Sequence, residues 1–489
     1  MRLHNIIRTL GAALSIGAVL PAAAEDAVPI TSDQVLSGTP WIMPQVFQTS
    51  DNPALQQYLY YQFMWRSFIA VSWPNVMLEI GERDGNPAIL SGRRGEPDAS
   101  RGILSSTGNN PLPLSVWETY REPFEIFLPP EQWADYPDWN DPRPQPKNAP
   151  EDARELLRYP TGMTGYATDT NQPYFFPDPT GPLIDQHGNY VRYEVAVNEA
   201  FFTYVKHFRY YDAGVQEQAV MASVLNPDAP DGFQPPPKGT QEQFDGGYLS
   251  TLAAYPYAMQ GLVDVKAAWK VLGPDDRRER YLHRKVWIDN EGSFRDMGLV
   301  ALHILRFTPE GYVASTFEQV DNTDATFRPY DGLKPSFNDS SPPNAIQARL
   351  GFEGDIPSGT LINPEPADIY RVSTLTVGDL SVSAANNVFQ TALGDSVFAY
   401  YRLIGTQNKR PGTTFTPGQA GLNGHMGSIT GVYTNTSELI NAALESYSQA
   451  NFSCILCHVR ARPKGVPDQA LEEDRFKILT FLLQSAQSE

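Results

Sequence analysis

Two cysteines and a histidine near the end of the chain form the pattern with the most specific chemistry in this sequence. Cys454 and Cys457 are separated by two residues, and His458 follows the second cysteine directly. C-x-x-C-H is the attachment signature of a c-type haem. The two thiols bond to the vinyl groups on one edge of the porphyrin, and the histidine becomes the proximal iron ligand. The spacing therefore predicts one covalent haem c with His458 as its axial ligand.

A redox-active thiol pair, a structural disulfide and a chance C-x-x-C are the alternative interpretations of this pattern. A redox pair has no need of a histidine in the next position, and it usually opens a helix after a strand of a thioredoxin-like unit. No such unit precedes Cys454, and the chain of 489 residues contains only these two cysteines. These observations favour haem attachment.

The N-terminus has the pattern of a secretory signal peptide. Arg2 and Arg8 form a basic region before a short apolar run over residues 10–20, and a small-residue cleavage site ends at Ala24. The run is shorter than the ~20 residues that span a bilayer, and no later segment approaches that length. Haem is attached to C-x-x-C-H on the far side of the bacterial inner membrane. We therefore expect residues 1–24 to be removed and the mature protein to be soluble and periplasmic.

The charge balance limits the partners. The chain has 37 Lys and Arg against 56 Asp and Glu, and loss of the two arginines of residues 1–24 would change its net charge from −19 to −21. Such an acidic surface argues against nucleic acid and anionic membranes as partners. It suits a basic redox partner protein, or it serves solubility alone. A small-molecule substrate remains an alternative.

The sixth ligand of the iron has to come from upstream in the chain, or the iron is five-coordinate. Residues 459–489 contain neither Met nor His. His303, in an apolar strand-like segment, is one candidate, and Met426, which follows His425 in a glycine-rich loop, is another. For His303 the alternative is a buried side chain bonded to a backbone carbonyl, because a buried polar group needs a partner.

Catalysis at a haem would need an open distal side, a base and a positive group. His303 is the candidate base, with Arg306 and Glu318 on adjacent predicted strands. A surface salt bridge between Arg306 and Glu318 is the alternative. Electron transfer is therefore the leading function, and a haem peroxidase, a haem oxidase or a sensor of a diatomic gas is the alternative. The chain is far longer than a small cytochrome requires, which supports an enzyme.

The elements that position these residues are predicted by periodicity and capping. Asn52 and Pro53 are typical of a helix start, and an apolar, aromatic segment follows to residue 73. Period-two alternation over residues 261–272 indicates a half-buried strand. Further strands are predicted at residues 193–198, 283–288, 297–307 and 312–320, and further helices at 199–211, 387–401, 435–447 and from 468 onward.

This order of elements predicts an α+β fold. We expect a central antiparallel β core with flanking helices, long Pro-rich loops and a C-terminal helical haem c segment. After the signal peptide, residues 25–182 form an N-terminal helix and a Pro-rich region, residues 183–434 the β-rich core, and residues 435–489 the haem segment. We expect all three to belong to one folded unit.

Several blocks of the sequence resemble a family of large secreted bacterial proteins described as cytochrome c family proteins. The blocks are residues 67–74, 116–120, 265–270, 298–303, 315–322, 401–407 and 453–458. They follow one another along nearly the whole mature chain. Many members carry a second histidine three residues after the position of His303, where this chain has Arg306. The resemblance implies one covalent haem and no particular reaction.

Overall fold

A computed structural model describes most of the chain. The described residues are 29–44, 48–83, 86–103, 113–144, 183–226, 233, 247–258, 261–288, 291–308, 311–323, 335–338, 366–369, 371, 375–409, 439, 441–446, 458, 461–467 and 480–488. The predicted signal peptide (1–24), Cys454, Cys457, His425 and Met426 lie outside these residues.

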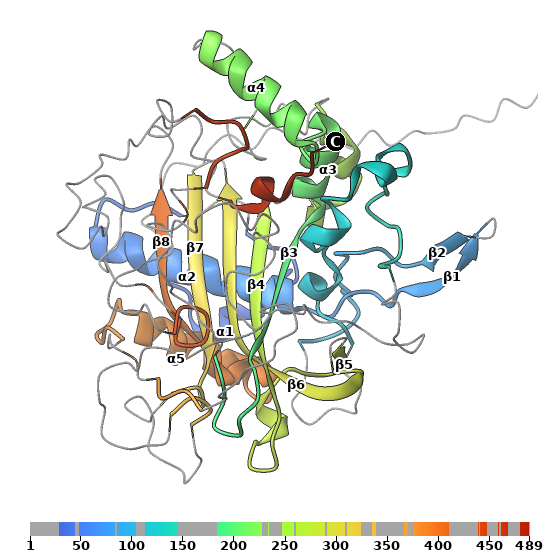
Figure 1. The fold of residues 1–489 in the computed structure, drawn as a ribbon. Coiled ribbons are helices and arrows are strands. Elements are labelled where there is room, and N and C mark those ends of the chain that lie inside the picture. The colour runs from blue at the N-terminus through green and yellow to red at the C-terminus, as the bar shows by residue number, and fades with distance from the viewer. Residues whose placement is uncertain are drawn as a thin grey trace, which may run out of the picture.

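The centre of the molecule is a six-stranded antiparallel sheet (Figure 1). Its strands are β3 (Arg192–Val197), β4 (Val263–Val271), β5 (His283–Ile288), β6 (Ser293–Thr308), β7 (Gly311–Gln319) and β8 (Tyr401–Lys409). The order across the sheet is β3-β4-β6-β7-β8, with β5 paired to the first part of the long strand β6. The predicted antiparallel β core and the α+β class are confirmed.

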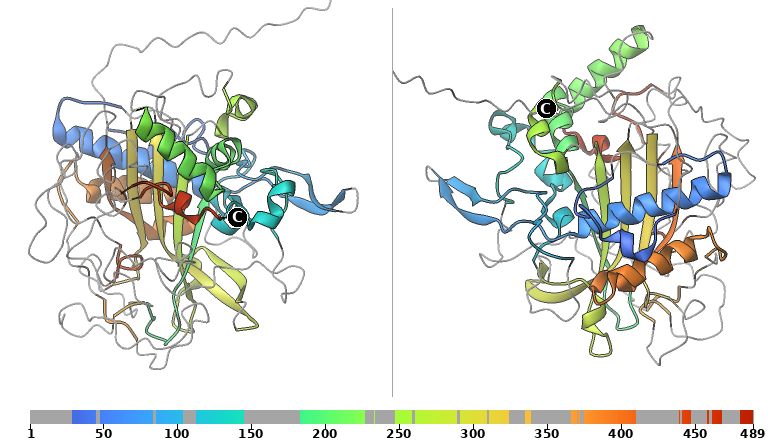
Figure 2. Two further views of the ribbon diagram at one scale, coloured as in Figure 1. Left: turned by 45° about the horizontal axis from the view of Figure 1, so that its top comes forward. Right: turned by 180° about the vertical axis from the view of Figure 1, so that it is seen from behind.

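Two helices cover one face of the sheet, as the right-hand view of Figure 2 shows. These are α2 (Pro53–Ser72) and α5 (Val382–Leu393). The predicted start of α2 is confirmed, because the Asn52 side chain accepts hydrogen bonds from the first two free amides of the helix. Trp65 and Phe68 of α2 then pack on Phe317 of β7, with ring centroids 5.0 and 4.2 Å apart. Aromatic packing therefore fixes this helix across the strands.

C-terminal residues lie on the opposite face of the sheet (Figure 1). Residues 442–444 form a buried cluster with Ala268 of β4 and Ala301 of β6. Residues 441–446 are hydrogen-bonded turns, whereas a helix was predicted over 435–447. The difference has a physical reason: the backbone amide of Ala442 is bonded to a side chain of the sheet, so tertiary contacts replace the helical pattern.

The remaining elements surround one end and one edge of the sheet. They include α3 (Glu199–Phe208), α4 (Ala213–Leu225) and the hairpin of β1 (Glu79–Arg83) and β2 (Asn86–Ser91), whereas α1 (Ser32–Val35) packs against α5 on the covered face. The helix predicted at 387–401 is α5, which runs from Val382 to Leu393 and is followed by a short 3-10 helix (Val397–Tyr400) and then by β8. Neither β8 nor α4 was predicted, because β8 mixes polar and apolar residues and α4 lacks an apolar stripe along one face.

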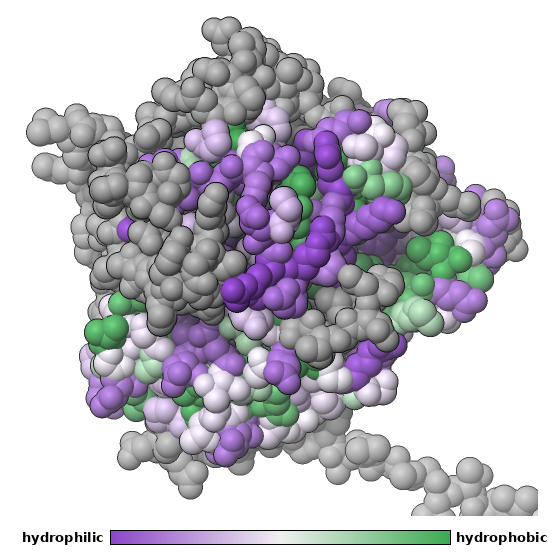
Figure 3. Space-filling model, turned by 90° about the horizontal axis from the view of Figure 1, so that it is seen from below, coloured by the Kyte–Doolittle hydropathy of each residue, from purple (hydrophilic) through white to green (hydrophobic). Residues whose placement is uncertain are grey.

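The surface combines a hydrophilic lower side with a few exposed apolar side chains in and beside the projecting hairpin of β1 and β2. Seen from below, the centre of the molecule is strongly hydrophilic, with a hydrophobic patch at the side where β1 and β2 project (Figure 3). Exposed apolar residues of this region include Met77, Ile80 and Leu90. Within the described part of the chain, no helix is long and apolar enough to cross a membrane.

Candidate functional site

His458 lies at one end of the sheet, close to two aromatic rings. Its ring centroid is 5.5 Å from that of Phe481 and 6.4 Å from that of Tyr312. Tyr312 is the second residue of β7 and pairs with Phe307, close to the end of β6. The predicted axial ligand is therefore partly buried at the end of the sheet where β4 begins.

His303 lies on the same face of the sheet as Tyr312. The register pairs His303 with Lys266 of β4 and Thr316 of β7, and it pairs Phe307 with Tyr312. Side chains alternate between the two faces of a strand, so residues an even number of positions apart share a face. Four positions along β6 correspond to roughly 13 Å. His303 and the surroundings of His458 thus belong to one continuous face.

The His303 ring faces a carboxylate. Its Nε2 is 3.4 Å from Oε2 of Glu445, and the two side chains are 15% and 23% exposed. The same carboxylate oxygen accepts a hydrogen bond from the backbone amide of Asn441 at 3.0 Å. Burial alone would raise the pKa of Glu445, but His303, Lys266 and the Asn441 amide lower it below its ordinary value. His303 is therefore paired with an acid and not with the backbone carbonyl that the alternative prediction named.

Arg306 is on the opposite face of β6, three residues from His303. It is fully buried, and its Nη1 donates to the carbonyl of Pro44 at 2.7 Å and to the Ser67 hydroxyl at 2.9 Å. Its guanidinium also lies over the ring of Phe63, 4.8 Å from the centroid. An odd spacing on a strand separates side chains onto different faces. The predicted cooperation of His303 with Arg306 is therefore wrong for this geometry.

Glu318 is fully buried on the His303 face and forms ion pairs with Arg371 and Arg402. The predicted surface salt bridge between Glu318 and Arg306 is wrong, because both residues are buried and they point to opposite faces. Glu318 Oε1 also accepts a hydrogen bond from the backbone amide of Ala442 at 2.6 Å. Through this hydrogen bond Glu318 holds the C-terminal chain against the sheet.

Asp264 is a buried acid close to His458 that the sequence did not single out. The strand that carries it was predicted to be half-buried, but C-terminal residues cover the side on which Asp264 lies. Its Oδ2 accepts a hydrogen bond from the Thr480 hydroxyl at 3.2 Å, and the next residue, Phe481, contacts His458. Burial raises the pKa of Asp264 to about 7, and Thr480 and Lys266 oppose that shift.

Replacing Asp264 by Asn is expected to remove a pH dependence of the free energy of unfolding. The folded pKa of about 7 lies above the ordinary value of 3.8, so the folded state binds the proton more tightly. The contribution to stability is complete below pH ~4 and is lost as the pH rises toward ~7, at up to about 1.4 kcal/mol per pH unit. Urea unfolding of the wild type and Asp264→Asn between these pH values tests this. Asp33→Asn, at an exposed position, is the control, and parallel profiles for the wild type and Asp264→Asn would contradict the prediction.

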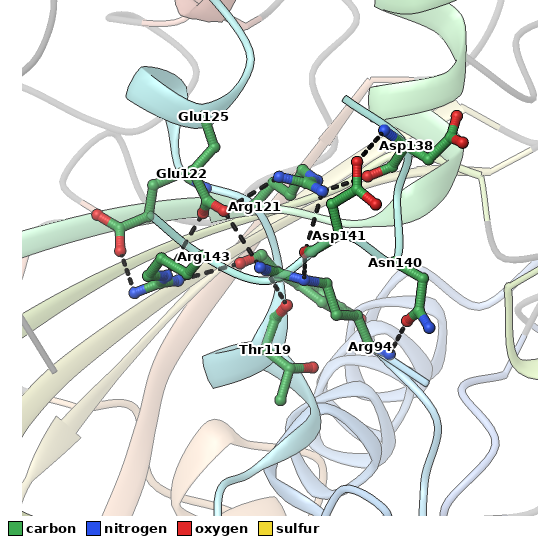
Figure 4. Close-up of polar contacts among 10 residues, drawn as sticks. Arg94, Thr119, Arg121, Glu122, Glu125, Asp138, Asn140, Asp141 and Arg143 are labelled. Atoms are coloured by element: carbon green, nitrogen blue, oxygen red, sulfur yellow. Dashed lines mark hydrogen bonds and ion pairs between the residues drawn. The ribbon is translucent and has the colours of Figure 1, made fainter. Parts of the chain in front are cut away.

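A second, largely buried cluster of charged residues joins segments that precede β3 in the chain (Figure 4). Glu125 Oε1 is 3.1 Å from Nη1 of Arg121 and 3.3 Å from Nη2 of Arg94. Arg143 is 3.5 Å from Glu125 and 2.5 Å from Glu122. Burial would raise the pKa of Glu125, but the three guanidinium groups lower it below its ordinary value. We call these five residues the arginine cluster.

The arginine cluster is structural. Besides the ion pairs, Arg94 donates to the backbone carbonyls of Thr119 and Asp141, and Arg121 donates to the carbonyl of Asp141. Burial lowers the pKa of Arg94 to about 10, against the opposing effect of Glu125. The cluster thus joins irregular segments between residues 94 and 143, where the described residues form no long helix or strand.

Comparison with protein-family models, curated proteins and solved structures finds no match to this chain. Among the residues that the structure describes, no group of three or more His, Cys, Asp or Glu side chains is arranged to hold a metal ion. The candidate site therefore consists of His458, its aromatic neighbours and the polar face that carries Asp264 and His303.

Proposed function

We propose that this protein is an exported haem c protein that transfers electrons. One haem is bonded to Cys454 and Cys457, and its iron is ligated by His458. The observation that carries this proposal is the C-x-x-C-H sequence at residues 454–458, joined to a signal-like N-terminus. The resemblance to secreted cytochrome c family proteins points in the same direction, and the periplasm is the proposed compartment.

The surroundings of His458 fit a haem. Tyr312 and Phe481 present aromatic rings beside the imidazole, and such rings pack well against a flat apolar macrocycle. Bound haem would supply a one-electron redox centre. The chain's own residues would then position the imidazole and limit the access of water. A basic protein is the proposed redox partner, because the chain is strongly acidic.

A haem-dependent oxidoreductase of the peroxidase or oxidase type is the second candidate function. The observation that favours it is the pair formed by His303 and Glu445, which is partly exposed on the His458 side of the sheet. A histidine held by a carboxylate can take a proton and return it. In this second candidate function Glu318 and Arg306 take no part in proton transfer, because both are buried and bonded to other groups.

Optical spectra of the purified protein, oxidised and reduced, with and without carbon monoxide, test the proposal. Sharp low-spin bands that carbon monoxide leaves unchanged are expected for an electron carrier whose sixth ligand, His303 or Met426, comes from upstream. A high-spin spectrum that responds to carbon monoxide would favour the enzyme or a gas sensor, and turnover of peroxide or oxygen would then separate these two. Absence of covalent haem would overturn all three functions.

A further inference from the structure

We propose that Glu318 and Gln216 are positioning residues that hold the chain on either side of His458. Each accepts a hydrogen bond from a backbone amide, Glu318 before the histidine and Gln216 after it. Through these two bonds they keep His458 against Tyr312 and Phe481. The consequence for haem rests on the proposed function, whereas the holding of the chain does not.

On the first side, residues 441–446 are fastened to the sheet. Ala442 donates its amide to Glu318, and the Asn441 side chain donates to the Thr316 hydroxyl at 2.8 Å and to the Phe317 carbonyl at 2.9 Å. The Tyr193 hydroxyl donates to the Ala443 carbonyl at 3.1 Å. Glu318 is the one charged acceptor among these groups, and hydrogen bonds to charged groups are the strongest.

On the second side, residues 461–467 are fastened to α4. Gln216 is fully buried, and its Oε1 accepts a hydrogen bond from the backbone amide of Lys464 at 2.8 Å. Its Nε2 donates to the carbonyl of Leu483 at 2.9 Å and also to the carbonyl of Tyr210. One buried amide thus joins three separate segments. The chain at Gly465 packs so closely against α4 that a Cβ atom at this position would clash with Glu217.

The two anchors act on the same histidine from different elements. Lys464 follows His458 by six residues, and the Ala461 amide donates to the His458 carbonyl at 3.0 Å. Leu483, the other partner of Gln216, lies two residues after Phe481, whose ring contacts the imidazole. Gln216 therefore holds both the chain that carries the ligand and the ring beside it. Loss of either anchor should let His458 move relative to Tyr312.

Three variants and one control test this inference in the full-length protein. Glu318→Met removes the acceptor for Ala442, whereas Glu318→Gln keeps an amide oxygen there, and both remove the charge that faces Arg371 and Arg402. A difference in hydrogen exchange between these two variants therefore reports the effect of the hydrogen-bond acceptor alone. Gln216→Met removes the second anchor. Glu125→Met is the control, because it also removes a buried carboxylate from its arginines, in the arginine cluster.

Hydrogen exchange, followed by mass spectrometry, measures how tightly the backbone amides of the two held segments are bonded. Glu318→Met should speed exchange over residues 441–446, and Gln216→Met should do so over residues 461–467, each about tenfold, as expected for loss of one strong hydrogen bond. Glu318→Gln should stay closer to the wild type than Glu318→Met does. Unchanged exchange in both Met variants, or an equal increase in Glu125→Met, would overturn the proposal. If Glu318→Met fails to fold, Gln216→Met and Glu318→Gln still decide it.

The haem provides a second readout that general destabilisation does not move. Imidazole should bind to the ferric haem about tenfold faster in Glu318→Met and Gln216→Met. In these variants the chain that carries His458 should move away from the iron more often and leave a coordination position open. Glu125→Met should bind imidazole at the rate of the wild type. Faster exchange with unchanged imidazole binding would overturn the positioning of His458. If the wild type carries no haem, the proposed function fails, and hydrogen exchange alone decides the anchors.

Discussion

Serine in place of both Cys454 and Cys457 is expected to abolish covalent haem binding completely. Each thioether needs a cysteine thiol, and these are the only two cysteines of the chain. The expected loss is one haem per chain, measured by the intact mass of the purified protein and by haem staining after denaturing electrophoresis. Single serine variants should keep at most one thioether and should show a lower yield of bound haem.

His458→Met is the matched control for the cysteine variants. Both thiols remain, so the haem should stay covalently attached, while the changed axial ligand shifts the absorption spectrum. This variant separates attachment from ligation. Haem that stays bound to the double serine variant after denaturation would contradict the assignment of the C-x-x-C-H sequence.

Glu125→Met is expected to lower the free energy of unfolding by about 3–5 kcal/mol, as when one member of a buried ion pair is removed. Glu125 is fully buried and contacts Arg94, Arg121 and Arg143. Without it, the buried guanidinium groups of Arg94 and Arg121 and the partly buried one of Arg143 share fewer carboxylates. Urea unfolding followed by circular dichroism measures the change.

Glu131→Met is the control for this prediction, because Glu131 is exposed and its loss should change stability by less than about 0.5 kcal/mol. The pH dependence adds a second check. The pKa of Glu125 is lowered in the folded state, so its contribution is present above its ordinary pKa of 4.5 and is lost as the pH falls below it. This is opposite in sign to the behaviour expected of Asp264. A loss below about 1 kcal/mol for Glu125→Met would show that the cluster adds little to stability.

Local patterns predicted the elements whose own residues determine them. The cap at Asn52 and the aromatic content of the segment after it specified α2, since both signals are contained in neighbouring residues. The alternation in β4 likewise specified a strand. β4, however, was expected to be a half-buried strand with its polar side facing outward, and on that side Asp264 proved to be buried beneath Thr480. A period-two alternation of apolar and polar residues shows that the two faces of a strand differ, but it does not show which other segments cover each face.

The same limit explains the candidate site. Residue spacing alone separates His303 from Arg306, because an odd spacing on a strand divides them between faces. The side chains that contact these residues come from distant parts of the chain. Glu445 contacts His303, Ser67 contacts Arg306, and Arg371 contacts Glu318. These contacts depend on long-range packing, and no local pattern encodes them.

By itself, the sequence determined the C-x-x-C-H spacing, the acidic net charge and the strands and helices with strong local signals. Each of these follows from the chemistry or periodicity of neighbouring residues. Only the tertiary structure decided that Glu318 and Gln216 reach the backbone on either side of His458. It also decided that C-terminal residues cover the face of β4, β6 and β7 that carries Asp264, His303 and Glu318. The physical reason is that a buried polar group takes whichever partner the fold brings to it, and that partner can be hundreds of residues away.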